Sequence, residues 1–182
     1  NENGRMARLD DLFKFYKKHK LKIASIEDLI SYRLKNEKLV LNTNKKVLKT
    51  KKYGNFDLRT FKNKLDNFEH YSITRGKFKG SKPVRVRVVS INIINNKINF
   101  NNQILKNSLK YLSKFTNFVL IIIKSQNFAL TKSNKDKYTN TLRYYGIGAQ
   151  IIKDLKIRKM ILITKSKKNI IGLDGYGIKI TK

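Results

Sequence analysis

Cysteine is absent from this sequence of 182 residues, and its absence excludes several kinds of protein. Without a thiol the chain has no cysteine nucleophile, no disulfide and no thiolate zinc ligand, which fits a reducing cytoplasm. Histidine occurs only at His19 and His70, and each stands alone in the sequence. A small disulfide-stabilised scaffold is therefore excluded, and so is a zinc site built from thiolates.

Long apolar runs are missing as well. The longest candidate, residues 118–123, has the length of a strand and is far too short to span a membrane. The N-terminal stretch does not resemble a secretory signal, because Arg5 and Arg8 are followed at once by Asp10 and Asp11 and no apolar core comes after them. These features predict a cytoplasmic protein with no membrane segment.

Acidic residues are few, and the formal net charge is +30 with an isoelectric point near 10.3. Such a charge is typical of proteins that bind nucleic acid, because phosphates release counterions to lysine and arginine. Here the excess is mostly lysine, is spread along the whole chain, and accompanies abundant asparagine, isoleucine, phenylalanine and tyrosine. We favour compositional drift in an AT-rich genome, with only non-specific attraction of nucleic acid.

The first part of the chain reads as a helix, a strand and a second helix. Residues 9–20 place two acidic residues in a first helical turn and form one apolar face from Leu9, Leu12, Phe13 and Tyr16. Residues 21–24 are predicted to be a short strand. Ser25 and Asp28 form a capping-box pattern that opens a helix to about residue 35.

From residue 37 the sequence changes to extended segments, and we expect a mostly antiparallel sheet with breaks at Asn44, Gly54 and Gly76. The expected strands are residues 38–42, 47–51, 56–61 and 68–74. Residues 83–94 begin with alternating valine and arginine at 84–88, which predicts a half-buried strand with Arg85 and Arg87 on its open face. Either a phosphate pocket or a solvated strand face fits that spacing.

The second half alternates helices with strands. Residues 103–114 are amphipathic and precede the apolar run 118–123, which must be covered on both faces as a strand. The polar residues 125–140 are expected to form a loop. A helix over 142–155, a strand over 159–164 and a last strand over 178–181 complete the prediction, with a glycine-rich turn at 172–177.

Two stretches resemble the fused dihydroxybutanone phosphate synthase and GTP cyclohydrolase II proteins of riboflavin synthesis. NENGRMARL at residues 1–9 with IEDLISYR at 26–33 is similar to the final segment of the synthase domain. YGIGAQIIKDL at 145–155, with RKM at 158–160 and GLDGYG at 172–177, resembles the series that ends the cyclohydrolase domain. PVRVRVVS at 83–90 resembles a strand of that same domain, so the resemblance covers nearly the whole chain in the expected order.

The resemblance implies a catalytic zinc held by three cysteines, and here the first of these positions falls at Asn92. The other two belong to a turn for which this chain has KINFNN at 97–102. Asparagine oxygen is a poor zinc ligand, and no cluster of histidine or carboxylate nearby replaces it. We therefore expect no zinc in this segment. The family's catalytic tyrosine falls at Ile122, and the phosphate-handling loop after it is replaced.

Four residues remain as candidates for holding a nucleotide or phosphate. Arg143 stands where the resemblance implies a nucleophilic arginine, and we expect it to be vestigial or structural. Thr164 and Lys168 lie where the family's nucleotide-binding strand ends, and Arg87 belongs to the strand resembling the family motif. None is assigned as catalytic.

The sequence thus predicts an α/β (α+β) protein with a cyclohydrolase II-like mixed sheet flanked by helices. Residues 1–36 are expected to be the C-terminal tail of a synthase-like domain, and residues 37–182 a degenerate cyclohydrolase II-like domain. The start without methionine, in mid-motif, suggests a fragment of a longer protein. Its parent would carry an active synthase that uses Mg²⁺, and a homodimer is expected.

Three functions are compatible with the sequence. The first is a non-catalytic domain that supports or regulates a fused 3,4-dihydroxy-2-butanone 4-phosphate synthase, with residual nucleotide binding left open. The second is part of an active enzyme, either the synthase that makes dihydroxybutanone phosphate and formate from ribulose 5-phosphate, or a cyclohydrolase II completed by missing parts. The third is a basic nucleic-acid-binding module.

Overall fold

The structure is a computed structural model that describes residues 4–25, 28–29, 32–33, 36–64, 68–78, 82–125, 146–164 and 177–181. The chain divides into two compact units, Asn1–Arg33 and Leu34–Lys182. Among the described residues, no helix is both long enough and apolar enough to span a membrane.

The first unit contains α1, Leu9–His19, which confirms the helix predicted over residues 9–20. Arg8 caps its N-terminus, and the Arg8 backbone N–H donates to the Asp11 carboxylate over 3.0 Å. Lys20 caps its C-terminus in the left-handed conformation, with φ of 52°. No residue of α1 is buried, and its apolar face, including Leu12 and Phe13, lies exposed.

The strand predicted over residues 21–24 is wrong, because those residues are neither strand nor helix in the structure. A lone strand leaves its backbone groups unpaired, and no second strand of this unit lies in the described residues to pair with it. The capping box that follows is confirmed: the Asp28 backbone N–H donates to Ser25 Oγ over 2.9 Å. The described residues after it, 28–29 and 32–33, are helical.

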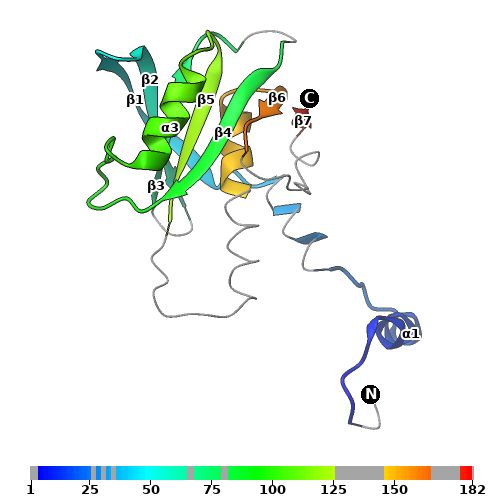
Figure 1. The fold of residues 1–182 in the computed structure, drawn as a ribbon. Coiled ribbons are helices and arrows are strands. Elements are labelled where there is room, and N and C mark those ends of the chain that lie inside the picture. Colours follow the sequence, from blue (N-terminus) through cyan, green and yellow to red (C-terminus); the bar gives the residue numbers. More distant parts are fainter. Residues whose placement is uncertain are drawn as a thin grey trace. The chain divides into compact units, whose positions relative to one another are not determined.

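The second unit is built on a mixed sheet of seven strands in the order β1-β2-β3-β5-β4-β6-β7 (Figure 1). Neighbours from β1 through β3 to β5 are antiparallel, whereas β5, β4, β6 and β7 are parallel. The predicted mixed sheet is thereby confirmed. The strands are β1 Val40–Thr50, β2 Gly54–Asn63, β3 Glu69–Arg75, β4 Val84–Ile91, β5 Phe118–Lys124, β6 Lys159–Leu162 and β7 Lys179–Ile180.

Two of the predicted strands, 38–42 and 47–51, are one continuous strand, β1. The break expected at Asn44 is instead a bulge, where the register with β2 shifts between Asn42 and Asn44. The breaks at Gly54 and Gly76 are confirmed, because Gly54 begins β2 and Gly76 follows the end of β3, and both glycines have positive φ. Asn44 therefore disturbs the register of β1 without ending the strand.

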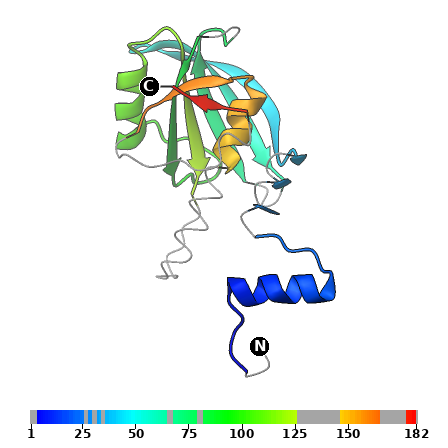
Figure 2. The same cartoon turned by 90° about the vertical axis from the view of Figure 1, so that its right-hand side faces the viewer.

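Helices cover both faces of this sheet (Figure 2). The first is α3, Gln103–Leu112. Its N-cap is Asn102, whose side chain accepts from the Ile104 backbone N–H over 2.9 Å. The second helix occupies residues 146–154, the described part of the helix predicted over 142–155. The loop expected over 125–140 lies outside the described residues from 126 onward.

The apolar strand β5 shows why both helices are needed. Its six apolar residues are fully buried and alternate between two separate core clusters. One cluster includes α3, and the other includes the helix at 146–154. The residues facing α3 are Phe118, Leu120 and Ile122, and those facing the other helix are Val119, Ile121 and Ile123.

Candidate functional site

Strands β4, β5 and β6 run parallel, so their carboxyl ends point the same way. The chain passes from β4 through α3 to β5 on one side of β4, and later returns to place β6 on its other side. In open α/β sheets, ligands bind outside the carboxyl ends of the strands where the winding direction reverses. This edge of the sheet is the candidate site, and Asn92 follows directly after β4 there.

A tight turn occupies the edge after β4. Ile94 and Lys97 form an isolated antiparallel bridge, and the Lys97 backbone N–H donates to the Ile94 carbonyl over 3.0 Å. Between them Asn95 and Asn96 have φ of 50° and 52°. Two consecutive residues with positive φ are the mark of a type I′ turn, which asparagine tolerates better than most residues. Asn92, just before this turn, has an exposed side chain.

Tyr71 of β3 reaches this turn from the core. Its hydroxyl lies 2.8 Å from the Asn96 carbonyl oxygen and 2.9 Å from Glu69 Oε2, so its single hydrogen is shared between two acceptors. Burial raises the pKa of the Tyr71 phenol, and the hydrogen bond and charge of Glu69 raise it further. The phenol therefore remains a hydrogen-bond donor across the physiological range.

Lys124, the last residue of β5, reaches the same turn from a second strand. Its Nζ donates to Asn96 Oδ1 over 3.2 Å and lies 5.0 Å from the centre of the Phe68 ring. Its backbone N–H donates to Nδ1 of the buried His70 over 3.2 Å. The turn after β4 is thus attached to two neighbouring strands through one residue, Asn96.

Arg87 lies on a covered face of β4, not on an open one as the alternation predicted. Its Nε donates to Ser108 Oγ of α3 over 2.8 Å, and that hydroxyl donates to the Ile104 carbonyl over 2.6 Å. Its neighbour Arg85 stacks on the Phe115 ring at 3.9 Å. Alternation along one strand does not reveal that α3 crosses this face, which explains the error.

Of the remaining candidates, only Thr164 lies among the described residues. It follows the end of β6 by two residues, just beyond the pair that Leu162 forms with Val86 of β4. Arg143 and Lys168 lie outside the described residues.

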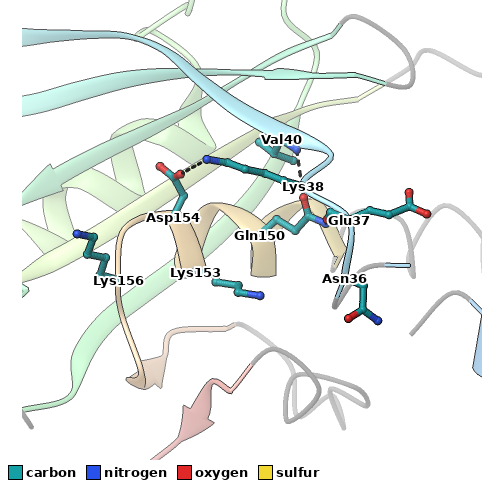
Figure 3. Close-up of a pocket in the computed structure, with 8 residues that line it drawn as sticks. All are labelled: Asn36, Glu37, Lys38, Val40, Gln150, Lys153, Asp154 and Lys156. Atoms are coloured by element: carbon teal, nitrogen blue, oxygen red, sulfur yellow. Dashed lines mark hydrogen bonds and ion pairs between the residues drawn. The ribbon is translucent and has the colours of Figure 1, made fainter. Parts of the chain in front are cut away.

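A cleft of about 340 Å³ opens elsewhere in the second unit, between the segment before β1 and the helix at 146–154 (Figure 3). Gln150 lies at its floor, 8% exposed, with its side-chain amide bonded to the backbone of that segment. Lys38 and Asp154 form an ion pair of 3.5 Å at its rim. The sequence offered one signal for Gln150, a polar residue within an otherwise apolar helix face.

The profile of the family described as GTP cyclohydrolase II matches residues 42–182, which include the whole candidate edge. This chain belongs to the GTP cyclohydrolase II family. The resemblance noted in the sequence is thereby confirmed. Tyr71, Asn96 and Lys124 were not among the predicted site residues, because their importance depends on the packing of three strands.

Several relatives of this cyclohydrolase II family member are riboflavin biosynthesis proteins. The RibBA proteins of Aquifex aeolicus and Bacillus subtilis are 34% and 33% identical to it over 206 residues. A 3,4-dihydroxy-2-butanone 4-phosphate synthase of Photobacterium phosphoreum is 31% identical over 198 residues. All of this chain aligns in each case, but it covers only 50%, 52% and 53% of the three relatives.

A solved structure matches the cyclohydrolase II fold of this chain with a TM-score of 0.70 and 28% identity. It is described as RibBX, a two-domain 3,4-dihydroxy-2-butanone 4-phosphate synthase from A. baumannii. The match covers all of this chain and 52% of that one. The chain thus spans about half the length of the relatives that it matches.

The described residues at this end of the sheet do not fit the zinc that the family resemblance implies. The chain contains no cysteine. In the described part of the chain, no three residues of the metal-binding types His, Asp and Glu come together. The polar groups at this edge are instead the exposed Asn92 amide, the Tyr71 phenol, the cationic Lys124 and one carboxylate, that of Glu69. Zinc prefers several thiolate, imidazole or carboxylate ligands, so this set with a single carboxylate does not suit it.

Proposed function

We propose that this chain is a non-catalytic GTP cyclohydrolase II-like domain of a riboflavin biosynthesis protein. In this proposal its fold is retained to support or regulate a fused 3,4-dihydroxy-2-butanone 4-phosphate synthase. The observation that carries the proposal is the set of polar groups at the carboxyl ends of β4 and β5, where the exposed Asn92 stands at a position to which the resemblance assigns a cysteine and the following turn contains no cysteine.

The position of Ile122 supports the same conclusion. This residue stands at the place that the resemblance assigns to a catalytic tyrosine, and its side chain is completely buried in the cluster beneath α3. An isoleucine supplies packing and no proton or hydrogen bond. Core packing and site chemistry depend on different residues, so a fold can outlast its chemistry.

The names of the relatives agree with a supporting role. The Photobacterium phosphoreum protein and the A. baumannii RibBX are named for the synthase alone, although this chain matches about half of each. We propose that this chain likewise has a synthase partner in its parent protein, with Mg²⁺ as the synthase cofactor. A homodimer is part of the proposal, and light scattering of the parent protein tests it.

The first unit supports this arrangement by its exposed apolar residues. Leu9, Leu12, Phe13 and Phe15 of α1 are each at least 42% exposed, and α1 buries none of its residues. Clusters of exposed apolar side chains mark surfaces that pack against another body. We propose that residues 1–36 complete a synthase domain. Amide exchange in α1 should then be much slower in the parent protein than in this chain.

Two measurements test the proposed function directly. The purified chain is incubated with zinc, desalted and analysed for bound metal, and it is then supplied with GTP as the only substrate. We expect no stoichiometric zinc and no formate. Stoichiometric zinc together with formate release from GTP would support the alternative of an active cyclohydrolase II and would contradict the proposal.

The parent protein provides the second arm of the test. Given ribulose 5-phosphate and Mg²⁺, it should produce dihydroxybutanone phosphate and formate. Removal of residues 37–182 should lower the yield of folded synthase or its dimer content, while the chemistry per folded active site persists. A parent reading frame that encodes no synthase domain would overturn this half of the proposal.

A further inference from the structure

Residues 92–102 connect β4 to α3, and something must hold this connection in place against the sheet. In a metal-bound turn, ligands from separate segments meet at one ion and cross-link the backbone. Here the chain carries no thiolate to do so, yet this connection follows a defined path through the tight turn at Asn95 and Asn96.

Two side chains from neighbouring strands meet at Asn96. Tyr71 from β3 donates to its backbone carbonyl over 2.8 Å, and Lys124 from β5 donates to its side-chain oxygen over 3.2 Å. We propose that Tyr71 and Lys124 hold this connection in the place of a metal ion, so that it stays folded with no cation bound. The comparison with a metal site rests on the proposed function, whereas the two attachments do not.

Tyr71 is the firmer of the two attachments. It is 5% exposed, and its ring belongs to the cluster that includes Ile122 and the apolar face of α3. A ring held by packing keeps its hydroxyl at a fixed point, so the hydrogen bond to Asn96 costs little additional side-chain entropy. The turn is therefore tied to the part of the core that α3 also contacts.

The turn itself is preorganised for these contacts. The positive φ values of Asn95 and Asn96 and the backbone hydrogen bond between Lys97 and Ile94 define its shape locally. The backbone carbonyl and the side-chain oxygen of Asn96 accept hydrogen bonds from the sheet. The turn thus defines the local shape of the connection, and Tyr71 and Lys124 fix its position against the sheet.

Charge at this point disfavours a cation. The Lys124 ammonium lies against the Asn96 oxygen and over the Phe68 ring, so a second positive charge would be repelled. The only carboxylate among these contacts, Glu69, shares the Tyr71 hydroxyl hydrogen with the Asn96 carbonyl. One carboxylate beside an ammonium group is a poor site for a divalent cation.

Amide hydrogen exchange of residues 93–101 in the full chain tests the proposal. In Tyr71→Phe and in Lys124→Met, exchange in this segment should become roughly three- to tenfold faster, the range expected from losing one net hydrogen bond. Asn96→Asp should restrain the segment at least as well as the original, because its carboxylate pairs with Lys124. Zinc or EDTA should leave exchange in the unaltered chain unchanged.

Matched controls separate these effects from general destabilisation. Tyr111→Phe and Lys106→Met make the same chemical changes at exposed positions of α3 and should leave the segment unaffected. If Tyr71→Phe does not fold, Lys124→Met decides the outcome. Exchange within twofold of the original in the folded variants, or a response to zinc or EDTA, would overturn the proposal. GTP turnover would contradict only the proposed function.

Discussion

The side-chain amide of Gln150 forms a hydrogen bond with the backbone N–H of Val40, the first residue of β1. Gln150 Oε1 accepts from the N–H groups of Val40 and Leu39 over 3.1 and 3.0 Å, and its Nε2 donates to the Glu37 carbonyl over 3.0 Å. Figure 3 shows Gln150 and Val40 together among the residues that line the cleft. These bonds attach residues 37–40 to the helix at 146–154. Residues 37–40 precede residue 42, at which the family match begins.

Replacing this amide should cost considerable stability. Gln150→Ala removes three hydrogen bonds and leaves the buried Val40 N–H without a partner, so we expect a loss of roughly 2–4 kcal/mol in the free energy of unfolding. Chemical denaturation measures it. Gln103→Ala removes an exposed glutamine that bonds Asn107 on the surface of α3 and should change stability by less than about 0.5 kcal/mol. Equal losses in both variants would disprove the role given to Gln150.

The contact between Ser108 and Arg87 predicts a structural role for this arginine. Ser108→Ala removes the acceptor of Arg87 Nε beneath α3 and should lower the free energy of unfolding by about 1–3 kcal/mol. Ser113→Ala, at the end of the same helix, is the matched control and should have a much smaller effect. A negligible loss at Ser108 would show that Arg87 is satisfied elsewhere.

Tyr71 predicts a dependence of stability on alkaline pH. Because burial and Glu69 raise the pKa of its phenol above the unfolded value near 10, the folded state holds the proton more tightly. Its stabilising contribution is therefore complete below about pH 10 and is lost as the pH rises further. Denaturation at pH 8 to 11 should show the difference in stability between the original chain and Tyr71→Phe shrinking above pH 10. A constant difference would contradict it.

Gly76 predicts a steric effect. Its φ is +90°, and an added Cβ would lie 2.7 Å from the Thr116 carbonyl oxygen. Gly76→Ala should therefore cost about 2–4 kcal/mol, combining left-handed strain with a backbone clash. Gly177→Ala has φ of +68° but no atom within 4 Å of the new Cβ, and should cost only about 1 kcal/mol. Similar melting temperatures for the two variants would argue against the clash.

Much of the fold followed from local patterns. The apolar run at β5 required cover on both faces, and the amphipathic residues before it formed α3. The capping pattern of Ser25 and Asp28 also formed as predicted. Such features depend on neighbours within a few residues, which a sequence displays directly.

The sequence predictions were wrong where strand pairing or burial depends on an element distant in the sequence. Residues 21–24 have the composition of a strand but lack a partner strand among the described residues of their unit. The break expected at Asn44 became a bulge, because pairing with β2 continues on both sides of it. Arg87 alternates with valines as an exposed residue would, yet α3 covers it.

The sequence by itself determined the family, the order of most elements and the absence of thiolate ligands, since these depend on residue identity and short-range periodicity. Only the tertiary structure decided which side chains meet at the edge of the sheet. Tyr71 and Lys124 are 53 positions apart in the sequence, and they reach Asn96 together because β3 and β5 are paired neighbours. Contacts between strands depend on sheet order and register, which no local pattern specifies.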